Sequence, residues 1–376
     1  MPEYPYIDFY KANGISPVGQ DITDLERHFQ RRDSLYRFLG VPPSFVKGRS
    51  VVEFGPGSGH NALFTLSLEP ARFLLVDGNP KGLSDTRALL SNGRFETYRW
   101  ELIESLFETF DSDERFDLVL AEGFLPHQPD PQALLRRLAR FVQPGGVLVI
   151  TTVSPASVLS ETLRRLIRTT LVAPNAPAAQ QLPILRQVLG PHLANLPGMS
   201  RSVDDWLLDN IVQPFGHAQL LTVPQAITAL ADDFDVYGAS PHFMTDSRWY
   251  KNVHGEDRGF NANVTACYRS IVANLLDHRS SAVSLSAAAG QALEEACGKL
   301  WRHMQAVEAR GTVARAPETS LFVQDIASAI KGYLPQTASA LDEAASFLLD
   351  RMDYEAMSQF PALWGRGQQY VSFIRR

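Results

Sequence analysis

Cysteine is scarce in this sequence. The chain has 376 residues and only two cysteines, Cys267 and Cys297. Two thiols cannot build a disulfide framework, and neither has a histidine or a second cysteine at the spacing of a metal site. Both lie in apolar helical patterns, so we expect buried free thiols and no bound metal.

Long apolar runs and an excess of positive charge are also missing. No stretch has the ~20 apolar residues that cross a bilayer. The start of the sequence, residues 1–6, lacks the basic and apolar parts of a secretory signal. The formal net charge is −6, whereas nucleic acids and anionic membranes attract dense positive surfaces. We therefore expect a cytoplasmic protein whose partners are neither nucleic acids nor membranes.

The composition is that of an ordinary globular protein. Apolar residues make up 45% of the chain and charged residues 20%, so a sizeable core can form. Three isolated arginine pairs interrupt this pattern, and we interpret them as solvated helix faces: Arg31-Arg32, Arg136-Arg137 and Arg164-Arg165.

The apolar pattern divides the chain into five segments. Residues 51–153 alternate short apolar runs with helical patterns, which is typical of a parallel sheet covered by helices on both faces. We expect a doubly wound α/β fold, with strands near 51–52, 73–76, 95–98, 118–120 and 147–150. The other segments are an N-terminal helical segment at 1–50, a helical insertion or lid at 154–224, remaining strands at 225–260, and a helical region at 261–376.

The C-terminal helical region carries an apolar stripe that needs a partner surface. Two alternatives remain open: the stripe forms a homodimer across a two-fold axis, or it completes the core of a single chain. The stripe consists of Leu293, Cys297, Leu300, Trp301 and Met304.

The most informative segment is 51–60, Val-Val-Glu-Phe-Gly-Pro-Gly-Ser-Gly-His. It predicts a buried strand, a glycine-rich turn and the start of a helix. Gly55 and Gly57 let the backbone turn sharply and approach a ligand without a Cβ in the way. Gly59 allows close packing where the helix begins, and the helix N-terminus offers free N–H groups to a carboxylate.

Two acids make this turn more specific. Glu53 lies two residues before the first glycine, and Asp77, followed by Gly78, ends the next strand. An acid at that place can accept hydrogen bonds from two ribose hydroxyls. The alternatives are an ordinary strand-to-helix turn and a nicotinamide-nucleotide site. The latter expects G-x-G-x-x-G, and here the third glycine comes one residue too early.

Residues 51–152 resemble the class I S-adenosylmethionine-dependent methyltransferases, whose signature E/D-x-G-x-G-x-G matches Glu53–Gly59. The segment 116–123 resembles the family's fourth strand, and the Pro-Gly-Gly turn at 144–146 resembles the turn before its fifth. The resemblance implies a Rossmann-like fold that binds S-adenosylmethionine and releases S-adenosylhomocysteine.

The resemblance also implies roles for single residues. The glycine loop would hold the methionine part of the cofactor, and Asp77 the ribose. Trp100 and Glu101 fall where the family contacts adenine, and Glu122 follows the strand whose end faces the methyl group. Glu122 is equally open to a role in binding the acceptor.

Catalysis by this family consists mainly of alignment and exclusion of water, but a hydroxyl acceptor needs a base. His127 follows the fourth strand and titrates near neutral pH, so it is our candidate base; the alternative is that it orders a loop. Arg248, Trp249 and Tyr250 combine a carboxylate- or phosphate-binding fork with stacking rings, and the alternative for them is an exposed strand.

We therefore predict a methyltransferase that acts on a small molecule, with a carbohydrate or a specialised metabolite as the candidate acceptor. Faint likeness of 201–215 and 241–251 to bacterial methyltransferases from such gene clusters supports this acceptor class. The alternative is a catalytically inactive protein that binds the cofactor and serves as a partner subunit or a sensor.

Overall fold

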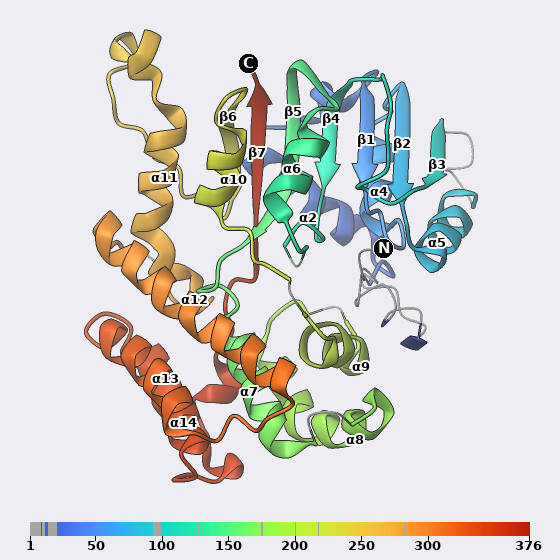
Figure 1. Cartoon of the computed structure of the whole chain (residues 1–376). Helices are drawn as coiled ribbons and strands as arrows, with labels where there is room; N and C mark the ends of the chain where they lie inside the picture. The colour runs from blue at the N-terminus through green and yellow to red at the C-terminus, as the bar shows by residue number, and fades with distance from the viewer. Residues whose placement is uncertain are drawn as a thin grey trace. The chain divides into compact units, whose positions relative to one another are not determined.

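The computed structural model describes residues 9, 12–13, 21–92, 99–126, 128–173, 176–199, 201–216, 218–281 and 283–376. The chain divides into two compact units, and each unit is built from separate segments. The sheet unit consists of 10–153, 218–268 and 368–376, and the helical unit consists of 1–9, 154–217 and 269–367. Most of the expected insertion (154–217) and most of the expected C-terminal region (269–367) thus belong to one helical unit (Figure 1).

The sheet unit contains a seven-stranded sheet in the order β3-β2-β1-β4-β5-β7-β6. The strands β1 to β5 run parallel, whereas β7 is antiparallel to both β5 and β6. The strand order reverses between β1 and β4, and ligands of such sheets bind at this reversal. The strands are β1 Ser50–Phe54, β2 Arg72–Asp77, β3 Trp100–Glu104, β4 Phe116–Ala121, β5 Val142–Val153, β6 Phe234–Ser240 and β7 Gln368–Arg375.

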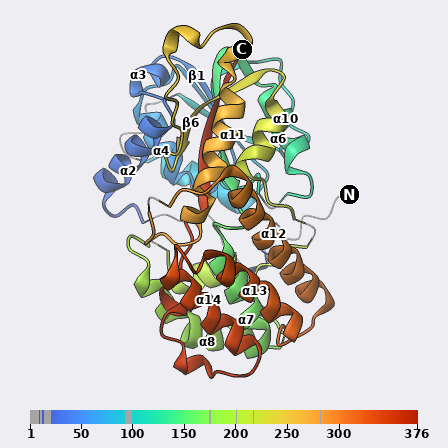
Figure 2. The ribbon, with the colours of Figure 1, turned by 90° about the vertical axis from the view of Figure 1, so that its left-hand side faces the viewer.

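Helices cover both faces of this sheet. Figure 2 shows α2, α3 and α4 on one side of the strands and α6 and α10 on the other. The side chains of β4 are all buried, as expected for a strand covered on both faces. The doubly wound α/β class is therefore confirmed. The helices are α2 Leu25–Phe38, α3 Pro43–Val46, α4 His60–Ser67, α5 Pro80–Leu90, α6 Pro131–Ala139, α10 Val223–Leu230 and α11 Phe260–Ile271.

Two strands differ from the sequence prediction. The expected strand at 95–98 lies outside the described residues, and β3 is found at Trp100–Glu104. The second difference is β7, because the region 261–376 was expected to be helical. Its last segment is a strand between β5 and β6 that buries Val371 and Phe373. The alternation of these two residues with polar ones is the strand period.

The helical unit surrounds α7, whose residues are buried almost all round. The apolar stripe of α12 is buried within the chain, so it forms part of the core of the helical unit. The predicted homodimer was based on this stripe and therefore loses its support. The main elements are α7 Leu159–Leu171, α8 Ala178–Leu189, α9 Val203–Trp206, the π-helix η3 Leu207–Val212, α12 Ala287–Arg310, α13 Pro317–Ile330 and α14 Pro335–Leu348.

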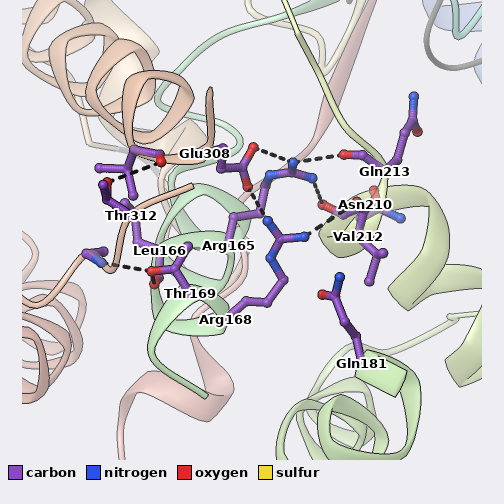
Figure 3. A network of polar contacts seen from close by, with 12 residues as sticks. Arg165, Leu166, Arg168, Thr169, Gln181, Asn210, Val212, Gln213, Glu308 and Thr312 are labelled. Atoms are coloured by element: carbon purple, nitrogen blue, oxygen red, sulfur yellow. Dashed lines mark hydrogen bonds and ion pairs between the residues drawn. The ribbon is translucent and has the colours of Figure 1, made fainter. Parts of the chain in front are cut away.

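The arginines of α7 contradict the expectation of solvated helix faces, because Arg164 and Arg165 are 0% and 1% exposed. Arg165 donates to the carbonyl oxygens of Asn210 at 3.1 Å and Gln213 at 2.8 Å. These carbonyls lie at the end of a helix, where they lack intrahelical partners. Glu308 of α12 accepts from Arg165 at 2.6 Å and from Arg168 at 3.0 Å (Figure 3). The arginines thus fix η3 and α12 to the central helix.

Among the described residues, no helix combines the length and the apolar character that a membrane crossing requires.

Candidate functional site

The glycine loop follows β1 and leads into α4. Gly55, Gly57 and Gly59 have φ angles of 70°, 58° and 78°, which L-residues with a side chain rarely adopt. A Cβ on Gly55 would lie 2.9 Å from Cδ1 of Phe124. Glycine is therefore required both by the turn and by the space above it.

Asp77, at the end of β2, holds this loop in place. One of its carboxylate oxygens accepts from the Gly57 N–H at 3.1 Å and the other from the Asn79 N–H at 2.8 Å. Burial raises the pKa of Asp77, and these backbone N–H groups partly offset the effect. Each carboxylate oxygen keeps a further lone pair, so Asp77 can hold the loop and still accept from a ligand hydroxyl.

Three acids meet at the carboxyl edge of the sheet. Glu53 lies on β1, paired with Leu75 of β2 and Leu120 of β4. Asp77 ends β2, and Glu122 comes directly after β4. These are neighbouring strands, so the predicted grouping of Glu53, the glycines, Asp77 and Glu122 is found in the fold.

Arg32 of α2 is the cation that pairs with this group. Its Nη1 and Nη2 each donate to a different oxygen of Glu122, both at 2.8 Å. The two side chains are 7% and 8% exposed. A bidentate arginine–carboxylate pair fixes both the charge and the orientation of the acid, so Glu122 is held rigidly beside the loop.

Glu53 differs from the other two acids in its hydrogen bonding. It is 4% exposed, and among the described residues its Oε2 has no hydrogen-bond partner. Burial raises the pKa of Glu53 to about 8; repulsion by Glu122 and Asp77 adds to the effect, and Arg32 opposes it. A buried oxygen without a donor is costly, and a ligand that carries an N–H cation would satisfy it.

Arg32 was expected on a solvated helix face, so its place beside the acids was not predicted. A signal was present in the spacing, because His28, Arg32 and Tyr36 recur every four residues and form the buried face of α2. His28 Nε2 lies 3.0 Å from the carbonyl oxygen of His60, and the Tyr36 hydroxyl lies 2.8 Å from that of Thr65. These contacts dock α2 on α4.

The structure does not bring Trp100 and Glu101 to the carboxyl edge. They pair with Phe73 and Leu74 near the start of β2, and Glu101 accepts from Arg72 at 3.0 Å near the opposite edge. The end of β3 that faces Asp77 is Glu104. The segment that follows approaches Gly78, where a Cβ would lie 2.9 Å from Leu106 Cδ2.

Two aromatic rings lie beside the glycine loop. The rings of Phe107 and Phe124 have centroids 4.2 Å apart at an angle of 34°. Both lie within 3.3 Å of the position that a Cβ on Gly55 would take. Phe107 follows β3 and Phe124 follows β4, so the pair brackets the edge at which the strand order reverses.

Arg248, Trp249 and Tyr250 lie away from this group. Arg248 donates to both oxygens of Asp246 and to the carbonyl oxygens of Asp257 and Arg258. Arg258 in turn pairs with Asp235, near the start of β6. The guanidinium therefore stabilises its own loop, and the residues Trp249 and Tyr250 are 60% and 69% exposed.

The candidate base His127 lies outside the described residues, so its role as a base stays a prediction.

An open hollow of about 910 Å³ is lined by Leu25, Phe29 and Phe64 together with polar residues of α2. None of the three acids lines it, and we assign the site by its chemistry instead.

A family model described as a methyltransferase domain matches residues 26–218, just over half of the chain. The match covers α2 except its first residue, the glycine loop and all three acids. The protein named ubiquinone biosynthesis O-methyltransferase from Stutzerimonas stutzeri is 30% identical over 110 residues. That alignment covers 29% of this chain, and the chain spans 46% of the relative's length.

Two solved structures were also found to be similar. One is an S-adenosylmethionine-dependent methyltransferase from Mesorhizobium loti, with 19% identity, coverage of 57% of this chain and 87% of that chain, and a TM-score of 0.36. The other is the N-methyltransferase NodS from Bradyrhizobium japonicum WM9 in complex with S-adenosylhomocysteine, with 20% identity, coverage of 41% and 76%, and a TM-score of 0.30.

Proposed function

Because the chain belongs to the family of the methyltransferase domain, as the resemblance had implied, we propose that it transfers a methyl group from S-adenosylmethionine to a small molecule and releases S-adenosylhomocysteine. The observation that carries this proposal is the arrangement of the Glu53–Gly59 loop, Asp77 and Glu122 at one edge of the sheet. The cofactor supplies an electrophilic methyl group on a sulfonium. The protein supplies binding, orientation and exclusion of water.

The methionine part of the cofactor fits the glycine loop. The backbone N–H groups where α4 begins suit its carboxylate, and Glu53 Oε2 suits its ammonium group, since this buried oxygen needs a donor. Asp77 and the adjoining Gly78 would hold the ribose hydroxyls. Glu122, fixed by Arg32, adds negative charge on the side of β4.

The adenine ring requires other residues than Trp100 and Glu101. The residues at the end of β3, namely Glu104, Ser105 and Leu106, lie beside Asp77 and Gly78. Ser105 N–H donates to the Asp77 carbonyl oxygen at 3.0 Å. We propose this segment as the adenine contact, with Phe107 and Phe124 as the flanking rings.

The acceptor is proposed as a small molecule, with a carbohydrate or specialised metabolite as the first class to test. The name of the Stutzerimonas stutzeri relative specifies transfer to oxygen, which supports hydroxyl acceptors. A hydroxyl needs a base, and we propose His127 for this role. Arg248, Trp249 and Tyr250 are not part of the proposal, because their loop binds its own arginine.

Calorimetry with S-adenosylmethionine and S-adenosylhomocysteine tests the cofactor proposal. We expect the wild type to bind both, and Asp77→Ala to lose most of the affinity. Asp111→Ala is the matched control, since Asp111 is an exposed acid of the same unit. Failure of both ligands to bind the wild type would contradict the proposal.

Turnover separates the enzyme from the inactive alternative. Metabolite pools incubated with methyl-labelled cofactor should yield a labelled small molecule with the wild type and less with His127→Ala. Tight binding of the cofactor without labelled product from any pool would favour the partner or sensor protein.

A further inference from the structure

The acid group at the carboxyl edge carries an unbalanced charge. Glu53, Asp77 and Glu122 are all buried or nearly so, and Arg32 is the cation that the structure pairs with one of them. If all three acids were ionised, Arg32 would neutralise one of them, and two negative charges would remain together in a region of low dielectric. Buried like charges resist simultaneous ionisation, so one acid must keep its proton.

The hydrogen bonds decide which acid that is. Asp77 accepts from two backbone N–H groups, and Glu122 accepts from both η nitrogens of Arg32. Both oxygens of each of these acids therefore already have a donor. Glu53 Oε2 lacks a donor among the described residues, so the proton belongs on Glu53.

We propose that Arg32 is a positioning residue of the cofactor site, which holds the Glu122 carboxylate fixed so that Glu53 holds a proton and releases it when a cationic ligand binds. This inference rests on the proposed function. The ammonium group of the cofactor replaces the proton as the charge that balances the group. The step is a transfer of one proton from the Glu53 carboxyl to the solvent buffer, and no bond to carbon changes.

The groups that face Glu53 come from three elements. Arg32 and Tyr36 belong to α2, Asp77 ends β2, and Glu122 follows β4. Tyr36 stays neutral, because burial raises its pKa to about 12. Tyr370 of β7 faces Arg32. The pKa of Glu53, about 8, follows from its burial and from its place in this group.

Calorimetry in two buffers of different ionisation enthalpy counts the protons that binding releases. At pH 7 we expect the wild type to release close to one proton per S-adenosylhomocysteine, and affinity to rise about tenfold from pH 6 to pH 7, since Glu53 is mostly protonated there. Glu53→Gln should remove both effects. The difference between the two proteins cancels any proton that the ligand itself exchanges.

Variants of the Arg32–Glu122 pair test whether Arg32 acts on cofactor binding through Glu53. Glu122→Gln removes a like charge, so the rise in affinity should move to lower pH. Arg32→Gln removes the balancing cation, so the rise should move to higher pH. Arg31→Gln is the matched control, because Arg31 is the exposed neighbour on α2. If Arg32→Gln does not fold, Arg32→Lys keeps the charge without the fork and should give a smaller shift in the same direction.

The outcomes separate this inference from the proposed function. Binding by the wild type with equal proton release in Glu53→Gln overturns the inference and leaves the proposed function intact. Shifts of the same sign in Glu122→Gln and Arg32→Gln overturn it as well. Absence of binding at every pH contradicts the proposed function, and the inference fails with it.

Discussion

Arg32 and Glu122 form a bidentate ion pair that joins helix α2 to the end of strand β4. Both hydrogen bonds are 2.8 Å long, and the residues lie 90 positions apart in the sequence. Both side chains are almost fully buried. The pair therefore connects α2, which precedes the glycine loop in the sequence, to the end of β4, which follows it. Glu122 belongs to the acid group that we assign to the cofactor.

Removal of one member of this pair should be more harmful than removal of both. A single Arg32→Met or Glu122→Leu variant leaves a buried charge unpaired, which costs about 3–5 kcal/mol of unfolding free energy. The double variant replaces the pair with apolar side chains and should recover much of the loss. Urea unfolding of the four proteins in a double-mutant cycle measures the coupling. Additive losses would show that the pair contributes no coupling energy.

The stability of the protein should fall as the pH rises, because of Glu53. The pKa of Glu53 is raised from 4.5 to about 8 in the folded chain, so the folded state binds more protons than the unfolded state between these values. The free energy of unfolding then decreases with pH in this window, by at most about 1.4 kcal/mol per pH unit. Urea unfolding at pH 6, 7 and 8 should show a flatter profile for Glu53→Gln than for the wild type. Parallel profiles would contradict the assignment.

Gly55→Ala should impair the cofactor site by more than backbone strain. Gly55 has a φ of 70°, and its Cβ would meet Phe124 at 2.9 Å. Gly145→Ala is the matched control, since Gly145 has a φ of 75° and open space around the added Cβ. Both variants should lose about 1–2 kcal/mol of stability from the left-handed backbone. We expect calorimetry to find weaker cofactor binding only for Gly55→Ala, and equal binding by both would contradict the steric reasoning.

The sequence predicted the parts of this site that depend on local pattern. Gly55, Gly57 and Gly59 and the acids around them stand at fixed places on strands and turns, and the order of parallel strands brings those places to one edge. Trp100 and Glu101 were expected at the carboxyl edge because the expected strand was set a few residues too early. Because β3 begins at Trp100, Trp100 and Glu101 lie at the start of the strand and not after its end.

The buried arginines could not be predicted in the same way. Arg32, Arg164 and Arg165 look like surface residues because a charge is usually solvated. Their burial depends on hydrogen-bond partners 28 or more residues away, such as His192 for Arg164, Glu122 for Arg32 and the carbonyl of Asn210 for Arg165. β7 was missed for a related reason, since a short strand at the end of a helical region gains its stability from β5 and β6 and not from its own sequence.

Glu308 should be essential to the stability of the helical unit. Its carboxylate neutralises Arg165 and Arg168 together. Glu308→Ala leaves two buried guanidinium groups without a counter-charge, so we expect a loss of about 3–5 kcal/mol. Glu295→Ala is the control, because Glu295 is exposed on the same helix. Thermal unfolding followed by circular dichroism measures the difference, and equal melting temperatures would show that the arginines need only their carbonyl partners.

Arg248→Ala should loosen a loop without affecting the cofactor. The Arg248 guanidinium binds the Asp246 carboxylate and the carbonyl oxygens of Asp257 and Arg258, and so connects the two ends of the loop. No residue of the acid group is among the partners found for it. We expect faster proteolysis within 246–258 and an unchanged affinity for S-adenosylhomocysteine. Lys251→Ala is the control, since Lys251 lies on the same loop and contacts only the rings of Trp249 and Tyr250 among the contacts found for it. A loss of cofactor affinity in Arg248→Ala would place this loop in the site after all, as the sequence had suggested.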